Sequence, residues 1–295
     1  MGVKQDTHLY GLDFTSAPRP GKPITCAAAT LSGGALHIEH IEPLLDFAAL
    51  ESLLARPGPW VAGIDAPFAQ PRRLVEALGW PQTWAGYVGE VAQLGKQGFE
   101  RTLKDYIGGK PKGDKLHRRR ADDLAGAVSP MALSYVPVGK MFLELAPRLR
   151  QTNLNVAPLR ETNDSRTVLE VYPALVARQL IGKRKYKSDT KQKQTEGMRE
   201  ARQEIVGKLR AGLERYALQL ELGDVLCAYL IDDATGDALD AVLCAVQAAW
   251  AVGQENYGIP NEVDRLEGWI ADPTLTEPLV VKTQRPKRDT RRKAA

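Results

Sequence analysis

Two aspartates three residues apart open one of the most apolar segments of the chain. The segment "GDALDAVLCAVQAAW" begins at Gly236 and places Asp237 and Asp240 ahead of a run of Ala, Val, Leu and Trp. Residues three apart share one face of a helix, and a buried carboxylate is costly unless something pairs with it. Asp13 and Asp65 stand in equally apolar segments. The placement of these acids asks for a chemical explanation.

A divalent cation would supply one. Carboxylates gathered at one place repel each other and raise each other's pKa. Mg²⁺ takes oxygen ligands and typically uses a few carboxylates together with water and a substrate phosphate. Two such ions about 4 Å apart can stabilise the attacking and leaving oxygens of phosphoryl transfer. A cluster of these acids would therefore favour metal-dependent chemistry at phosphorus.

The segments that carry Asp13 and Asp65 have the composition of buried strands. "HLYGLDFTSA" and "WVAGIDAPFA" each predict a strand ending near its aspartate. Between them, two more strands are expected at 24–33 and 35–44, followed by a helix within 45–56. This β-β-β-α-β order predicts a mixed α/β sheet. Ligand sites form at the carboxyl ends of strands in open α/β sheets, where both aspartates would lie.

The middle of the chain has a different character. Residues 71–163 mix Pro, Gly, Trp and basic residues, which predicts a long insertion of short helices and mobile loops. Apolar residues typical of a buried core return in the segment "SRTVLEVYPALVARQL". This segment predicts a strand around Glu170 and a helix starting at Pro173. An amphipathic helix is expected within 199–218, before the final helix at Gly236. Because repeats and a clear linker are absent from the sequence, we expect a single domain over 1–281.

The net charge of +4 comes from the end of the chain. Residues 282–295 hold seven Lys and Arg and one Asp, while residues 1–281 carry 33 basic and 35 acidic residues. Such a tail is expected to be disordered and could bind nucleic acid or merely aid solubility. The sequence has no apolar run long enough for a membrane span and no signal-peptide pattern. Its three cysteines lie in apolar segments, which predicts reduced core residues and a cytoplasmic protein.

Each acid also has a purely structural interpretation. Asp237 could favour a helix N-terminus, Asp65 could form a turn before Ala-Pro, and Asp13 could begin an Asx-type turn. Glu170 could pair with an Arg or Lys of the insertion. Asp240 is harder to explain this way, because it lies deeper in the helix between Leu239 and Ala241.

Four motifs, taken in order, resemble a known family. "GLDFT", "GIDAPF", "EVYPAL" and "DALDAVLCA" are similar to segments of the family called domain of unknown function 429, and "RRRADDLAGAVSPM" in the insertion is also family-like. Members are generally described as predicted nucleases of ribonuclease H fold. The last motif also resembles the closing helix of Holliday-junction resolvases, which share that fold. One departure is "FTS" after the first aspartate, where family members often have a glycine or cysteine.

The resemblance implies roles for individual residues. Asp13 would be the metal ligand on the first strand, Asp65 the acid ending the fourth strand, and Asp240 the acid of the final helix, with Asp237 beside it. Glu170 lies in a family motif and is a further catalytic candidate, although the ribonuclease H pattern needs only about four acids. The implied fold is a ribonuclease H-like mixed sheet flanked by helices, and it agrees with the strand order expected from the sequence itself.

Basic residues supply candidates for substrate binding. Arg119 and Arg120 could clamp phosphate, because Arg makes bidentate phosphate contacts, or could form a salt bridge opening the next helix. Lys185 and Lys187 flank an aromatic residue in "GKRKYKSD", as in single-strand binding surfaces, although a solvated loop explains the same pattern.

These observations predict a nuclease that uses Mg²⁺ or Mn²⁺. Asp13, Asp65, Asp237 and Asp240 would hold the metal, Glu170 would complete the catalytic set, and basic residues would contact the backbone of DNA or RNA. Two alternatives stay open. One is a non-catalytic nucleic-acid-binding protein of the same fold. The other is an actin-like or sugar-kinase-type phosphotransferase, although that class needs a duplicated core and glycine-rich phosphate loops that the sequence does not contain.

Overall fold

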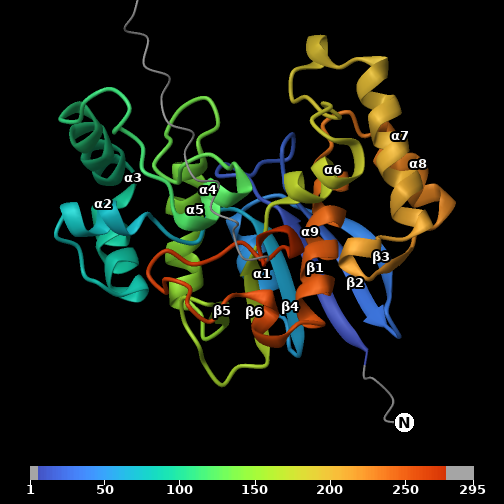
Figure 1. Ribbon diagram of the computed structural model, residues 1–295, viewed down its shortest axis with the longest axis horizontal. Helices are drawn as coiled ribbons and strands as arrows, with labels where there is room; N and C mark the ends of the chain where they lie inside the picture. Colours follow the sequence, from blue (N-terminus) through green and yellow to red (C-terminus); the bar gives the residue numbers. More distant parts are fainter. Residues whose placement is uncertain (1–5, 277–295) are drawn as a thin grey trace, which may run out of the picture.

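A mixed seven-stranded β-sheet forms the centre of the protein in the computed structural model, which describes residues 6–276 (Figure 1). The strand order is β5-β6-β4-β1-β2-β3-β7. The first three strands are antiparallel neighbours, whereas β4 lies parallel to β1 and starts a parallel half with β6 and β5. The strands are β1 (Thr7–Asp13), β2 (Ile24–Ser32), β3 (Ala35–Leu44), β4 (Trp60–Asp65), β5 (Asn155–Ala157), β6 (Arg166–Glu170) and β7 (Gln219–Glu221).

Helices cover both faces of this sheet (Figure 1). One face packs against α6, α7, α8 and α9, and the other against α1, α2, α3 and α5, so two hydrophobic cores lie back to back. The helices are α1 (Phe47–Leu54), α2 (Arg72–Ala77), α3 (Trp84–Gly108), α4 (Arg120–Ala125), α5 (Val138–Gln151), α6 (Pro173–Ile181), α7 (Glu196–Ala211), α8 (Asp224–Asp232) and α9 (Asp237–Val252).

The expected α/β class and the order β1-β2-β3-α1-β4 are confirmed. The strand around Glu170, the helix from Pro173 and the final helix also form where the sequence predicted them. The amphipathic helix α7 stops at Ala211, earlier than expected, because Gly212 adopts a φ of +101° that ends the helix. Helix α8 and the short edge strand β7 were not predicted from the sequence.

The segment 71–163 is more ordered than an insertion of short helices and loops. Its longest helix, α3, runs for 25 residues, with one non-helical residue at Gly95. Aromatic residues of α3 and α5, among them Tyr87 and Phe142, share a core with Leu12 and Ile64 of the sheet. The segment also contributes β5 to the sheet edge. Its apolar residues therefore complete the core on that face of the sheet, which the local pattern could not reveal. The basic tail at 282–295 lies outside the described residues.

The three cysteines are free and buried, as the sequence predicted. Cys26 packs in the core shared with α1 and α3, whereas Cys227 and Cys244 belong to the core around α9. Among residues 6–276, no helix combines the length and the apolar character needed to cross a membrane.

Helix α9 lies unusually close to the centre of the sheet. A Cβ atom added to Gly11 of β1 would stand 2.1 Å from the carbonyl oxygen of Ala241, and one added to Gly63 of β4 would stand 2.7 Å from that of Cys244. Real Cβ atoms do not approach other atoms this closely. Glycine on both strands therefore allows the backbone of α9 to rest directly on β1 and β4.

We expect Gly11→Ala to destabilise the protein by about 3 kcal/mol or more, because the clash is with helix backbone that cannot rotate away. Gly207→Ala is the matched control. It adds the same methyl group in open space on helix α7 and should stabilise by roughly 0.5–1 kcal/mol. Urea unfolding of both variants measures the difference. Equal stabilities would show that α9 can move away from the sheet at little cost.

Candidate functional site

Asp13 and Asp65 end two neighbouring parallel strands. They are paired in register at the carboxyl ends of β1 and β4. Side chains alternate between the faces of a strand, so each aspartate points to the same face as the glycine two residues before it, Gly11 or Gly63. That face carries α9. Both carboxyl groups therefore project from the sheet edge toward the start of that helix.

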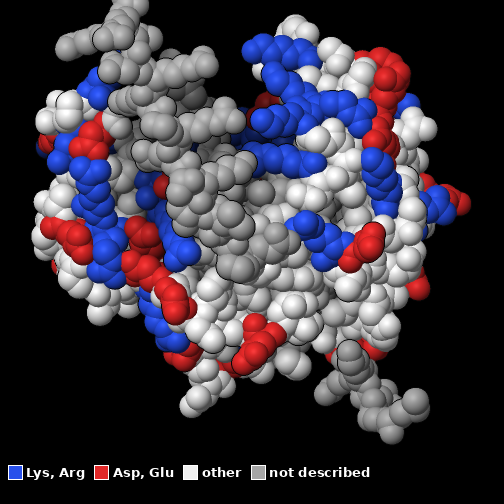
Figure 2. Space-filling model, viewed as in Figure 1, with Lys and Arg blue, Asp and Glu red and all other residues white. Residues whose placement is uncertain are grey.

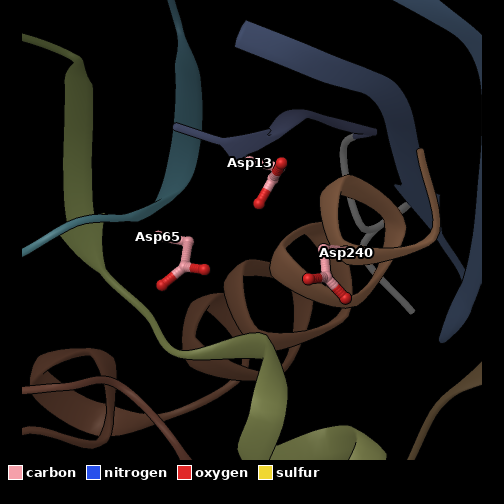
Figure 3. Close-up of side chains that lie close together, drawn as sticks. All are labelled: Asp13, Asp65 and Asp240. Atoms are coloured by element: carbon pink, nitrogen blue, oxygen red, sulfur yellow. The ribbon is translucent and has the colours of Figure 1, made fainter. Parts of the chain in front are cut away.

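Asp240 completes a cluster of three acids (Figure 3). It lies in the first turn of α9, just before the residues that touch Gly11 and Gly63. One carboxylate oxygen from each of Asp13, Asp65 and Asp240 lies within 4.8 Å of the other two. Figure 3 shows the three side chains around one space between the strand ends and the helix. Three oxygen donors at this separation could hold one metal ion.

Burial and mutual repulsion act on these carboxyl groups. Burial raises the pKa of Asp13 well above its usual value, and the charges of Asp240, Asp237 and Asp65 raise it further, while Lys187 lowers it. Burial also raises the pKa of Asp65 to about 7, with Asp240 adding to the rise. The cluster thus resists carrying its full negative charge, as expected for a site that a cation would stabilise.

Asp240 itself is covered by two side chains. Asp240 as a whole residue is 2% exposed. The hydroxyl of Tyr186 donates to its Oδ1 at 2.6 Å, and the ammonium of Lys187 forms an ion pair with its Oδ2. Burial alone would lower the pKa of Lys187, but Asp240 and Asp13 hold it well above its usual value. Lys187 therefore stays charged within the cluster.

A cleft of about 540 Å³ opens in front of the cluster. Asp13 and Asp65 form part of its wall, and Asp237, the first residue of α9, lies on the wall beside them. Asp237 is not one of the three acids whose oxygens lie within 4.8 Å of one another. The remaining lining residues come from distant segments and include Phe14, Thr15, Ser16, Lys22, Val136, Pro137, Met141, Lys187, Ser188, Asp189 and Thr235.

Glu170 and Arg119 occupy a different position from the one expected for a catalytic acid and a phosphate clamp. Arg119 is 1% exposed, and its guanidinium donates to Glu170 at 2.5 and 2.7 Å and to Asp122 at 2.7 and 3.0 Å. The carbonyl oxygen of Glu267 accepts a fifth bond. All five N–H donors of the guanidinium are thus engaged. Arg119 has no donor left for a phosphate, and the salt-bridge alternatives for Arg119 and Glu170 hold.

This buried ion network holds the chain segment that follows Asp65. Glu170 accepts a hydrogen bond from the backbone N–H of Phe68 at 3.0 Å, three residues after Asp65. It therefore fixes the chain where it leaves β4. Glu170 acts here as a positioning residue and does not join the three-acid cluster.

The remaining basic residues predicted to bind substrate differ in their position relative to the cleft. Arg120 is exposed at the start of α4, and Lys185 is exposed on the segment between α6 and α7. Neither lines the cleft, whereas Lys187 does. Lys22 lines the cleft and pairs with Asp189 at 2.7 Å, although it was not among the site residues predicted from the sequence. Its position in the turn "RPGKP" carried no signal, because only folding brings that turn to the start of α9.

The fold and site define an α/β protein with clustered carboxylates at the carboxyl edge of its sheet. The chain belongs to the family described as "Protein of unknown function (DUF429)", whose model matches residues 11–265, as the four sequence motifs indicated. No curated protein and no solved structure matches the chain significantly.

The stability of the metal-free protein should depend on the protonation of Asp65, and therefore on pH. The folded-state pKa of about 7 exceeds the ordinary value of 3.8, so the folded state binds the proton more tightly. Stability is therefore lost as pH rises from about 4 to 7. The difference between the two pKa values limits the stability lost when Asp65 ionises to about 4 kcal/mol. Solvent in the cleft makes the loss smaller. In chelator, we expect Asp65→Asn to gain stability relative to wild type between pH 4.5 and pH 8, measured by urea unfolding.

Asp232→Asn is the control for this experiment, because Asp232 is 63% exposed on α8. Its stability relative to wild type should change little with pH. A pH-independent difference between Asp65→Asn and wild type would mean that Asp65 is ionised in the folded protein at an ordinary pKa.

Arg119→Met should destabilise the protein by about 3–5 kcal/mol, because it leaves Glu170 and Asp122 buried without their partner. Arg120→Met removes the neighbouring, exposed guanidinium and should change stability by less than about 0.5 kcal/mol. Thermal and urea unfolding distinguish the two. Similar losses in both variants would contradict a structural role specific to Arg119.

Proposed function

We propose that this protein is a metal-dependent nuclease that hydrolyses phosphodiester bonds of nucleic acid. The observation that carries the proposal is the convergence of Asp13, Asp65 and Asp240, whose oxygens lie within 4.8 Å of one another beside an open cleft. Burial and mutual repulsion raise the pKa of Asp13 and of Asp65, which supports a cluster that a bound cation would stabilise.

The donor set fits Mg²⁺ or Mn²⁺, since all three groups offer oxygen. Asp13, Asp65 and Asp240 would hold this ion. Asp237, on the cleft wall, is the carboxylate available for a second ion. When bound, such ions supply the Lewis-acid chemistry of phosphodiester hydrolysis. The protein's own residues hold the acids in place and set the charge of the cleft.

The strand order supports a ribonuclease H-like core as part of this proposal. Three antiparallel strands, a helix and a fourth strand that returns beside β1 form the β-β-β-α-β unit that the family resemblance implied. The acids then lie at the ends of the first and fourth strands and on the last long helix. The seven strands within residues 6–276 belong to one sheet, and this arrangement does not favour the duplicated core of actin-like phosphotransferases.

The cleft lining holds four aspartates and two lysines, so the feature that favours a polyanionic substrate is the basic segment next to the cleft. Lys22 and Lys187 line the cleft beside the acids. Figure 2 shows Lys and Arg side chains gathered at the upper right, over the segment between α6 and α7. This basic segment, residues 183–193, includes the exposed side chains of Lys183, Arg184, Lys185, Lys191 and Lys193. Contacts from such residues go to the phosphate backbone of DNA or RNA and do not read bases.

The test is a Mn²⁺ titration by calorimetry, followed by cleavage assays on single-stranded, duplex and branched DNA and RNA. We expect Asp13→Asn and Asp240→Asn each to abolish metal binding and to lower cleavage by at least about 100-fold, since each removes a ligand of the shared ion. Asp232→Asn, which changes an exposed carboxylate on α8, should retain both.

Two results would contradict the nuclease proposal. Absence of metal binding in wild type, even with a non-cleavable oligonucleotide present, would make the carboxylates structural. Oligonucleotide binding without metal binding or cleavage would identify a non-catalytic nucleic-acid-binding protein instead.

A further inference from the structure

Lys187 stands between the cleft and Asp240. Asp13 and Asp65 line the cleft, but Asp240 is buried and has both oxygens engaged, one by the Tyr186 hydroxyl and one by the Lys187 ammonium. The side chain of Lys187 is 35% exposed and lines the cleft. A cation that arrives from the cleft therefore meets the lysine before it reaches the third carboxylate.

The ammonium of Lys187 already acts as the cation of the cluster. It interacts electrostatically with Asp13 and Asp65 as well as with its direct partner Asp240. A divalent ion held by the same three carboxylates would stand close to this positive charge. Like charges a few ångströms apart repel strongly where solvent is limited, so the lysine and the metal compete for one position.

The backbone on both sides of Lys187 is anchored, so a movement of Lys187 would be confined to its side chain. The carbonyl oxygen of Tyr186 accepts from Arg202 at 2.7 Å, and the N–H of Ser188 donates to the carbonyl oxygen of Ala234 at 3.2 Å. Both neighbours of Lys187 are thus tied to adjacent elements. Exchange at Asp240 therefore needs only a change in the Lys187 side chain, which has four rotatable bonds.

We propose that Lys187 occupies the cation position of the cluster in the free protein and moves to a substrate phosphate when the metal ion binds. This inference rests on the proposed function. A phosphodiester in the cleft would accept the displaced ammonium, which leaves Oδ2 of Asp240 free for the ion while Oδ1 keeps its hydrogen bond from the Tyr186 hydroxyl. Metal binding and phosphate binding therefore assist each other, and the protein loads its metal efficiently only when substrate is present.

The nearest other cation is already committed. Lys22 pairs with Asp189 at the rim of the cleft, so it does not compensate Asp240 in the free protein. The basic segment that contains Lys187 also supplies exposed Lys183 and Lys185 for neighbouring phosphates. A polyanion bound along this segment would draw the Lys187 side chain in the same direction.

The experiment is a Mn²⁺ titration of the full chain, with and without a 12-nucleotide phosphorothioate DNA that resists cleavage. Wild type should bind Mn²⁺ weakly alone and at least about tenfold more tightly with the oligonucleotide. Lys187→Met should bind Mn²⁺ alone at least about tenfold more tightly than wild type, because the competing charge is gone. It should gain little more from the oligonucleotide. Lys96→Met removes one exposed charge on α3 and should behave as wild type.

Thermal unfolding gives a second readout that does not depend on activity. Removal of the lysine leaves Asp240 without its ion pair, so Lys187→Met should unfold at a lower temperature than wild type in chelator. Mn²⁺ should then raise its unfolding temperature more than that of wild type, because binding to the folded state stabilises it. This response would be visible even in a variant that is only partly folded without metal.

The outcomes separate the two proposals. If Lys187→Met binds Mn²⁺ no more tightly than wild type, the exchange is wrong, while the metal site stands. If the variant binds Mn²⁺ more tightly but the oligonucleotide assists it as much as it assists wild type, coupling does not pass through Lys187 and the inference is overturned. Absence of Mn²⁺ binding in every protein, with and without the oligonucleotide, overturns the proposed function and this inference together.

Discussion

The backbone of α9 rests directly on β1 and β4, and the candidate site depends on this contact. Helix and sheet usually keep a distance set by their side chains, but Gly11 and Gly63 remove that spacing. The first turn of α9 is thereby brought beside the ends of the two strands. Asp240 then lies close enough to Asp13 and Asp65 for their oxygens to share one ion. Any residue larger than glycine at position 11 would separate these groups.

The protein balances its buried acids in two different ways. Glu170 and Asp122 share Arg119, whose donors are all engaged, so this group is neutralised within the fold and holds the chain that follows Asp65. Asp13 and Asp65 line the cleft, and the charge of Lys187, the ion-pair partner of the buried Asp240, offsets theirs. A complete ion network is suited to structure. A carboxylate cluster with one displaceable cation is suited to exchange of ligands. We therefore interpret the network around Arg119 as structural and the cluster around Lys187 as a binding site.

Much of the fold could be predicted from local patterns. The β-β-β-α-β order followed from short apolar segments bounded by turn residues, and Asp13 and Asp65 were expected at strand ends on the same ground. The extent of α3 and the membership of β5 in the sheet could not be predicted this way. Their apolar residues make contact with strands distant in sequence, and such contacts leave no periodic signal in the segment itself.

The sequence by itself determined the candidates: acids in apolar segments, two of them at strand ends, and basic residues around Lys187. Tertiary structure alone decided which of them share a site. Asp13, Asp65 and Asp240 were brought together, whereas Glu170 was drawn to Arg119 and away from the cluster. The physical reason is that electrostatic energy depends on distance and burial. These quantities arise only when β1 and β4 pair and α9 packs across them.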